Sequence, residues 1–146
     1  MQDTDIEHIE RACSALSISY ARAIDFRDYD AFLELFTDDA VLDTGQPLEG
    51  LDAIRASLAG RDDRLRTRHV ISNVFVDVLS TDAARGIAYL TLYRHRGDDS
   101  LRPGAVPLAG PAAVGHYEDR FARTSEGWRF RSRRLHVAFR DPAQFP

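Results

Sequence analysis

The spacing of the hydrophobic residues changes in the middle of the chain, and this change limits what the chain can fold into. Over residues 5–24 apolar side chains recur every three or four positions, which is the spacing of one face of an amphipathic helix. From Thr67 onward they recur every second position, which is the spacing of a strand with one buried face. Helices gathered at one end and strands at the other favour an α+β fold over repeating α/β units.

The first part of the chain predicts three helices. Asp28 or Asp30 suits the N-cap of the second helix, which we expect to carry Phe32, Leu33 and Phe36. In chain order the expected elements are a helix over 5–24, a helix around 30–36, a short strand over 40–43, a turn over 44–50 and a helix over 51–60.

The second part of the chain predicts strands in series, at residues 67–80, 87–96, 112–124 and 128–139. Gly and Pro are frequent in 97–112, which indicates a loop that could act as a lid. Strands in series predict a curved mixed or antiparallel sheet, which the three N-terminal helices would close into a cone enclosing a pocket. The length of 146 residues fits a single domain over 1–146.

Alternation assigns the side chains of each expected strand to two faces. In 67–80 the face that carries His69 also carries Asn73. Tyr93 shares a face with other aromatic residues on the next strand, and its hydroxyl could orient a substrate or make a structural hydrogen bond. Tyr117 is the expected inward residue of 112–124, because the face of its neighbour His116 is charged.

The run RFRSRR at 129–134 is the main basic cluster. Alternation places Arg129, Arg131 and Arg133 on one face, which we expect to be solvated and paired with acids on the neighbouring strand. Arg134 falls on the other face and is the candidate of this run for binding an anionic substrate.

Composition and motifs exclude several classes of function. The net charge of −4 gives no indication of a nucleic-acid partner, and no apolar run is long enough to span a membrane. The single cysteine, Cys13, cannot form an intrachain disulfide, which suits a cytoplasmic location. The chain has no P-loop, G-x-G-x-x-G or G-x-S-x-G motif, so no cofactor is expected. The five histidines are scattered without metal-ligand spacing, so no metal site is expected.

Two residues far apart in sequence are the candidates for acid–base chemistry. His69 opens a strand, and imidazole titrates near neutral pH, so a carboxylate partner could make it a general base; it could also simply pack at the strand end. Asp25 ends the first helix, where a negative charge opposes the helix dipole. Helical spacing places Asp25 away from the apolar stripe and does not decide whether it points inward.

Three stretches give the chain a familiar pattern: YARAIDFRDYDAFLELFTDDAVLD at 20–43, TRHVISN at 67–73, and GHYEDRFARTSEGWRF at 115–130. On these stretches the chain resembles the SnoaL-like family of the nuclear-transport-factor-2-like superfamily, whose fold is an α+β cone. Within it, the chain is most similar to the scytalone dehydratases and the hexachlorocyclohexane dehydrochlorinases. This resemblance implies that Asp25 and His69 form a buried dyad in which Asp25 polarises His69.

The surroundings of the implied dyad differ from those enzymes. Where the dehydrochlorinases carry a lysine and a pocket tryptophan, this chain has Tyr20 and Leu42. Where the dehydratases carry a serine and an asparagine, it has Gly115 and Tyr117. Neither substrate is therefore expected to carry over.

The hypothesis from the resemblance is a cofactor-independent lyase or isomerase, dehydratase- or cyclase-like, that acts on a small, largely apolar, cyclic substrate. Asp25 and His69 would transfer the proton. The expected substrate-binding residues are Tyr20, Leu42, Asn73, Tyr93 and Tyr117. The alternatives are a non-catalytic small subunit of a ring-hydroxylating dioxygenase-type complex and a small-molecule binding protein. The resemblance also implies a homo-oligomer, a dimer or trimer, formed through one sheet face.

Overall fold

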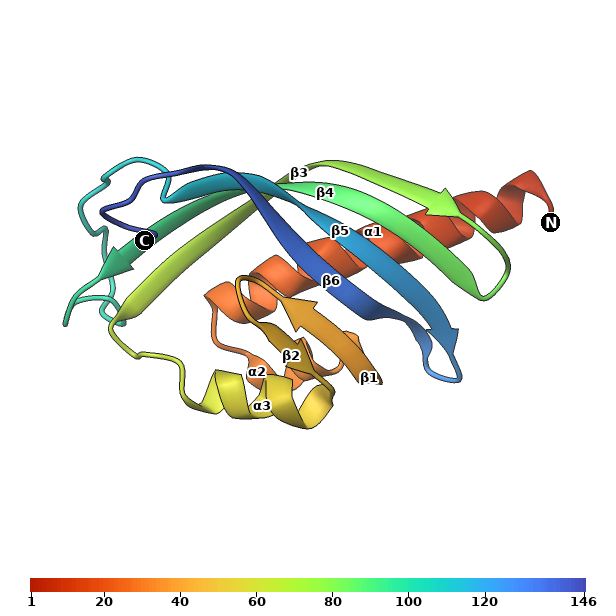
Figure 1. Ribbon diagram of the computed structural model, residues 1–146, viewed down its shortest axis with the longest axis horizontal. Coiled ribbons are helices and arrows are strands. Elements are labelled where there is room, and N and C mark those ends of the chain that lie inside the picture. The colour runs from red at the N-terminus through yellow and green to blue at the C-terminus, as the bar shows by residue number, and fades with distance from the viewer.

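The computed structural model describes all residues from Met1 to Pro146 and contains three helices and six strands (Figure 1). The helices are α1 (Asp3–Asp25), α2 (Tyr29–Leu33) and α3 (Leu51–Ala59). The strands are β1 (Phe36–Asp43), β2 (Pro47–Glu49), β3 (Leu65–Val78), β4 (Ala83–Arg96), β5 (Ala113–Thr124) and β6 (Gly127–Arg140). The predicted α+β class is confirmed.

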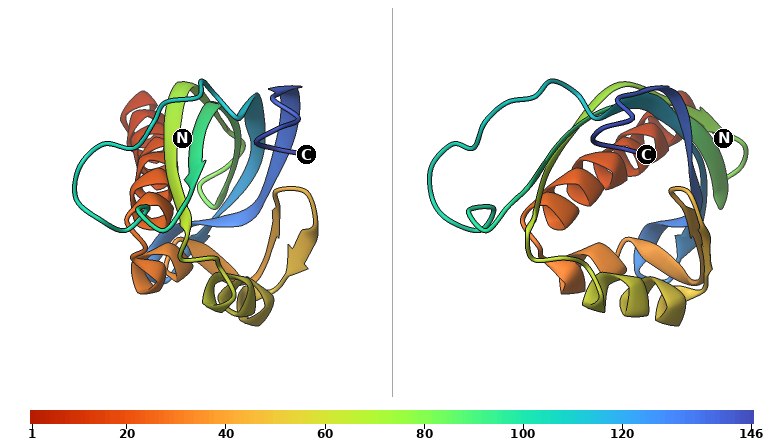
Figure 2. Two further views of the ribbon diagram at one scale, coloured as in Figure 1. Left: turned by 90° about the vertical axis from the view of Figure 1, so that its left-hand side faces the viewer. Right: turned by 60° about the vertical axis from the view of Figure 1, so that its left-hand side comes forward.

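All six strands form one curved sheet in the order β2-β1-β6-β5-β4-β3. Neighbours are antiparallel except β1 and β6, which run parallel, so the sheet is mixed. Helix α1 crosses the concave side of the long strands, while α2 and α3 lie at the end where β1 and β2 join the sheet (Figure 1; Figure 2). The predicted cone, with its N-terminal helices on the concave side, is confirmed.

Helix α1 packs on the sheet through the apolar stripe seen in the sequence. Five members of that stripe are less than one-tenth exposed: Ile9, Cys13, Leu16, Tyr20 and Ile24. The next helix, α2, begins after Asp28, whose Oδ1 accepts a hydrogen bond from the backbone N–H of Ala31 at 3.2 Å. None of the helices combines the length and apolar character that crossing a membrane requires.

The structure differs from the prediction around β1 and β2. Phe36 begins β1 instead of ending α2, and it pairs with Phe130 of β6. Its ring packs 5.2 Å from the ring of Phe32 and 5.4 Å from that of Phe130, so aromatic packing outweighs helix continuation here. The predicted turn at 44–50 contains the short strand β2, where Pro47 is tolerated because β2 lies at the sheet edge.

Two of the irregularities in strand pairing reverse the alternation of side chains in the middle of β3 and of β6. In β3 the register with β4 shifts between Ser72 and Phe75, and Asn73 has a φ of 49°, which marks a β-bulge. In β6 the register with β5 shifts at Arg131, which has no partner residue on β5. Residues after each bulge therefore face the opposite side from the one that strict alternation predicts.

A close approach of two strands accompanies the first bulge. A Cβ atom on Gly86 of β4 would lie 2.7 Å from the carbonyl oxygen of Phe75, so only glycine fits without a backbone shift. A β-bulge bends the strand that carries it, so this bulge contributes to the curvature of the sheet.

Candidate active site

The carboxylate of Asp25 holds His69 at two points. Its Oδ1 lies 2.6 Å from Nδ1 of the imidazole, and its Oδ2 accepts the backbone N–H of His69 at 2.8 Å. The side chains of Asp25 and His69 are only 5% and 11% exposed. A carboxylate beside Nδ1 favours the tautomer with a proton on Nδ1, and this leaves the lone pair of Nε2 available to a ligand.

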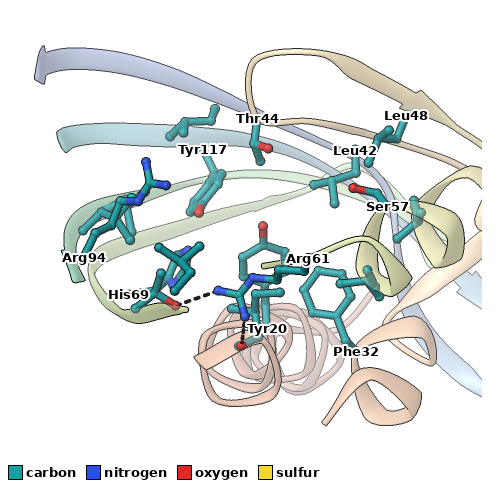
Figure 3. Close-up of a pocket in the computed structure, with 18 of the residues that line it drawn as sticks. Tyr20, Phe32, Leu42, Thr44, Leu48, Ser57, Arg61, His69, Arg94 and Tyr117 are labelled. Carbon is teal, nitrogen blue, oxygen red and sulfur yellow. Dashed lines mark hydrogen bonds between the residues drawn. The ribbon is translucent and has the colours of Figure 1, made fainter. Parts of the chain in front are cut away.

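Thr67 and Arg61 support this carboxylate from the side. The hydroxyl of Thr67 donates to Oδ1 of Asp25 at 2.8 Å and accepts from Nη2 of Arg61 at 2.9 Å. Nη1 of Arg61 also donates to the backbone carbonyl of Ile24 at 3.0 Å, at the C-terminal end of α1 (Figure 3). A cation at this end offsets the unfavourable interaction of Asp25 with the helix dipole.

His69 borders a cavity of about 420 Å³ on the concave side of the sheet. Of the 20 residues that line this cavity, 13 are hydrophobic, so its walls suit an apolar ligand. Tyr20 from α1 and Tyr117 from β5 stand across from each other beside His69 (Figure 3). The ring centroid of Tyr20 lies 6.2 Å from that of His69 and 5.6 Å from that of Tyr117.

Burial keeps both tyrosine hydroxyls protonated. It raises the pKa of Tyr20, and it raises the pKa of Tyr117 well above the ordinary value, although the nearby Arg133 acts in the opposite direction on both. Protonated hydroxyls can donate hydrogen bonds to a ligand oxygen. The two tyrosines therefore add hydroxyl groups next to the imidazole in a largely hydrophobic cavity.

Arg133 lies behind the tyrosine rings and is fully buried, so the expectation of a solvated arginine face is wrong for Arg133, although Arg131 is exposed. Its Nε and Nη2 donate to the two carboxylate oxygens of Asp119 at 2.8 and 2.9 Å, and Nη2 also donates to Ser17 at 2.6 Å. The guanidinium lies 4.0 Å from the ring centroid of Tyr117 and 4.4 Å from that of Tyr20. The reversal at Arg131 turns Arg133 inward, and sequence alternation could not reveal this.

The structure brings together some of the predicted site residues and not others. Tyr20, Leu42 and Tyr117 line the cavity with His69. Asn73 is exposed, because the β3 bulge lies at this residue and reverses the face. Tyr93 lies on the outer side of β4, where alternation with its inward neighbours Leu92 and Arg94 places it. Asn73 and Tyr93 are thus not positioned to contact a ligand in this cavity.

Two arginines that the sequence reading overlooked line the cavity, namely Arg61 and Arg94 (Figure 3). Arg94 continues the inward face of Leu90 and Leu92, so the alternation of β4 is a usable signal for it. Arg134, the arginine expected to bind an anion, points away from the cavity and is 60% exposed beside Asp43, with Nε 3.5 Å from Oδ2.

A cluster on the outer face of the sheet has the side chains of a divalent-metal site. His116 and His136 are cross-strand partners with stacked rings 5.0 Å apart. Their Nε2 atoms lie 3.4 and 3.3 Å from the two carboxylate oxygens of Glu118. Two histidines and a glutamate are ligands that zinc accepts. Spacing along the sequence did not indicate this cluster, because the sheet pairs residues that are distant in the chain.

Comparison with solved structures finds similar folds. A protein from Novosphingobium aromaticivorans, provisionally assigned as a scytalone dehydratase, is 22% identical with a TM-score of 0.77, over 95% of this chain and 89% of that chain. A hexachlorocyclohexane dehydrochlorinase of type 2 is 15% identical with a TM-score of 0.77, over 97% and 93%. A provisionally assigned aromatic ring hydroxylase from N. aromaticivorans is 26% identical with a TM-score of 0.71, over 90% of each chain. No curated protein matches the chain significantly.

The curved mixed sheet, the helices on its concave side and the cavity between them define an α+β cone of the nuclear-transport-factor-2-like class. A family model for the SnoaL-like domain matches residues 5–134, which is most of the chain. The protein therefore belongs to the SnoaL-like family, as the resemblance in its sequence predicted.

Proposed function

We propose that the protein is a cofactor-independent lyase or isomerase, dehydratase- or cyclase-like, in which His69 removes a proton from carbon and Asp25 holds and polarises His69. The observation that supports this most is the hydrogen bond of 2.6 Å between Asp25 Oδ1 and His69 Nδ1 at the edge of an apolar cavity. Structural neighbours include a dehydrochlorinase and a provisionally assigned dehydratase, which is consistent with elimination chemistry.

The proton transfer begins at Nε2 of His69. With Nδ1 protonated toward Asp25, Nε2 accepts a proton from a ligand carbon, and the carboxylate stabilises the imidazolium that forms. The imidazolium then returns the proton, either to a leaving group in an elimination or to another carbon in an isomerisation. A positioned general base of this kind contributes roughly 10²–10⁴-fold to the rate.

Tyr20 and Tyr117 would stabilise the negative charge that develops on a substrate oxygen. Both hydroxyls are protonated donors, and the buried Arg133 guanidinium behind their rings places a positive charge near them. Because the walls of the cavity are largely hydrophobic, such fixed donors interact more strongly with the developing charge than they would in bulk water.

The cavity dimensions suit a small substrate. Its volume of about 420 Å³ is near the lower end of the roughly 300–1,000 Å³ of small-molecule pockets. Its largely hydrophobic walls, which include Phe32, Leu42 and Leu90, favour an apolar and compact, for example cyclic, ligand body.

Deuterium exchange tests this proposal without knowledge of the natural substrate. A panel of small cyclic ketones and β-hydroxy ketones is incubated with the protein in D₂O, and exchange or elimination at the carbon next to the carbonyl is followed by NMR. We expect the wild type to catalyse the reaction of at least one compound, and His69→Ala to lower that rate by roughly 10²–10⁴-fold while its circular dichroism is unchanged.

His8→Ala is the matched control, because His8 lies exposed on α1 far from the cavity. Equal rates in wild type and His69→Ala would remove the catalytic assignment. Inactivity of the wild type, together with co-purification of a larger partner, would favour the alternative of a non-catalytic subunit. The structural similarity to a provisionally assigned aromatic ring hydroxylase is the reason for testing this alternative.

A further inference from the structure

Arg94 places an arginine in the cavity wall close to the proposed base. In the β3–β4 pairing Arg94 is the partner of Thr67, and His69 is the partner of Leu92. Thr67, His69, Leu92 and Arg94 all line the cavity. Arg94 and His69 are therefore diagonal neighbours on the inward face, with Cβ atoms roughly 7 Å apart. The guanidinium of Arg94 extends into the space beside His69 and Tyr117 (Figure 3).

Most hydrogen-bond donors of the partly buried Arg94 are free, in contrast to those of Arg61 and Arg66, which are also partly buried. A guanidinium has five N–H donors. Arg94 has one hydrogen bond, from Nη1 to the backbone carbonyl of Gln144 at 3.2 Å. Arg61 donates to Ile24, Tyr29 and Thr67, and Arg66 donates to four backbone carbonyls. Arg61 and Arg66 thus hold the fold together, whereas Arg94 retains donors for a ligand.

The charge balance of the cavity favours a negatively charged ligand group. Its lining contains the cations Arg61 and Arg94 and no carboxylate. The carboxylate of Asp25, which holds His69, is already engaged with His69 and Thr67. Burial lowers the pKa of Arg94, and repulsion from Arg96 and Arg61 lowers it further. A bound anion would relieve both effects, because it supplies the charge that the cavity wall lacks.

We propose that the cavity binds carboxylic acids with an apolar body and that Arg94 recognises their carboxylate. A planar, singly charged carboxylate matches the fork of one guanidinium and needs no second free cation. The apolar body would lie against Phe32, Leu42 and Leu90.

A carboxylate held by Arg94 would direct the carbons attached to it toward Nε2 of His69. The substrate class of the proposed reaction is then a small cyclic carboxylic acid, or one that carries a carbonyl or hydroxyl for the tyrosines. The statement that the bound acid is the substrate rests on the proposed function. The binding of the acid does not, because it requires no chemistry at His69.

The proposal is tested by comparing how tightly the full chain binds a charged compound and its uncharged analogue. Cyclohexanecarboxylate and cyclohexanecarboxamide have nearly the same shape, and their dissociation constants are measured by isothermal titration calorimetry or NMR titration. We expect wild type to prefer the carboxylate about tenfold or more, because charge-assisted hydrogen bonds are roughly twice as strong as neutral ones.

Arg94→Gln should abolish the preference, and Arg94→Lys, which keeps the charge but not the fork, should retain part of it. Arg68→Gln is the matched control, because it also removes one positive charge, in this case from the neighbouring strand β3. Arg68 is exposed and stacks over Phe26 outside the cavity. NMR spectra of Arg94→Gln check that the contact with Gln144 is not needed for the fold.

The outcome separates this proposal from the proposed function. His69→Ala should keep the preference for the carboxylate, because the base does not take part in binding. If the wild type shows this preference but catalyses no proton exchange, the carboxylate site is supported and the catalytic role of His69 is refuted. Equal affinity of wild type for the two probes, no binding of either, or an unchanged preference in Arg94→Gln would overturn the recognition of carboxylates by Arg94.

Discussion

Two buried carboxylates in this protein each hold a basic side chain, but in different surroundings. Asp25 and His69 are 5% and 11% exposed, and His69 borders the cavity. Asp119 and Arg133 are 1% and 0% exposed and are enclosed by α1 and the aromatic rings of the core. His69 of the first pair can meet a ligand, whereas the second pair is separated from the cavity by Tyr20 and Tyr117.

The difference lies in which group can exchange a proton. An imidazole has a ring nitrogen that can accept a proton and give it back, so His69 can act as a base and then as an acid during a reaction. A guanidinium remains charged, so Arg133 contributes a permanent positive charge and fixed hydrogen bonds. The enclosed pair thus organises the core and orients the tyrosines, while the pair at the cavity is suited to chemistry.

Breaking the enclosed pair on one side should have the largest effect on stability. Arg133→Met leaves the carboxylate of Asp119 buried without its partner, and we expect the free energy of unfolding to fall by about 3–5 kcal/mol. Urea denaturation measures the change, with Arg131→Met on the exposed side of β6 as the control. The double variant Arg133→Met/Asp119→Leu should recover most of the loss, because no unpaired charge remains; a double variant as unstable as the single one would contradict this account.

Breaking the pair at the cavity should mainly affect activity. Asp25→Asn keeps the shape of the side chain but removes the charge that stabilises the imidazolium, so we expect the rate of proton exchange to fall by about 10²-fold. Asp28→Asn is the matched control, since asparagine caps helix α2 as well as aspartate does. A full rate in Asp25→Asn would show that the two pairs do not differ in function.

The hydroxyl of Thr67 should contribute a smaller part to the same pair. Thr67→Val keeps the size of the side chain but removes the donor to Asp25 and the acceptor for Arg61. We expect a loss of roughly 1–2 kcal/mol in the free energy of unfolding, while Thr67→Ser should behave as wild type. Equal stability of the valine and serine variants would mean that the hydroxyl does not support the carboxylate.

The burial of Cys13, which lies near the enclosed pair, should affect the stability of the protein at high pH. Burial, with a smaller contribution from Asp119, raises the pKa of the Cys13 thiol to about 12 from 9.0. The folded state therefore holds this proton more tightly than the unfolded chain, so its contribution is complete below pH 9.0 and is lost as the pH rises toward about 12. The loss should reach about 1 kcal/mol at pH 10. Cys13→Ala should show a shallower fall of stability between pH 9 and 10, and an identical pH dependence would refute this assignment.

Much of the architecture could be predicted from the sequence, because the hydrophobic spacing of residues 5–24 and of the later strands is regular. The inward direction of Tyr117 also follows from alternation, since the extra residues at the β5–β6 register shifts lie on β6 and β5 itself alternates regularly. Asp25 and His69 were paired only through the family resemblance. Their proximity is now visible in the structure, and their catalytic role stays a prediction.

The misplaced residues share one physical cause. Asn73 and Arg133 each lie at or just beyond a bulge, where one extra residue exchanges the two faces of a strand. A bulge depends on contacts with the neighbouring strand, so local spacing contains no signal for it. Tyr93 and Arg94 are a different case, because alternation with Leu90 and Leu92 was sufficient to place them.

The bulge at Asn73 also affects how this strand can be aligned with relatives. A homologue with a regular strand would need a one-residue gap between Ile71 and Val76 for its inward positions to correspond to those seen here. An ungapped alignment would match the core residue Val76 to a solvent-facing position, and any substitution pattern inferred for this stretch would then mix two unrelated environments.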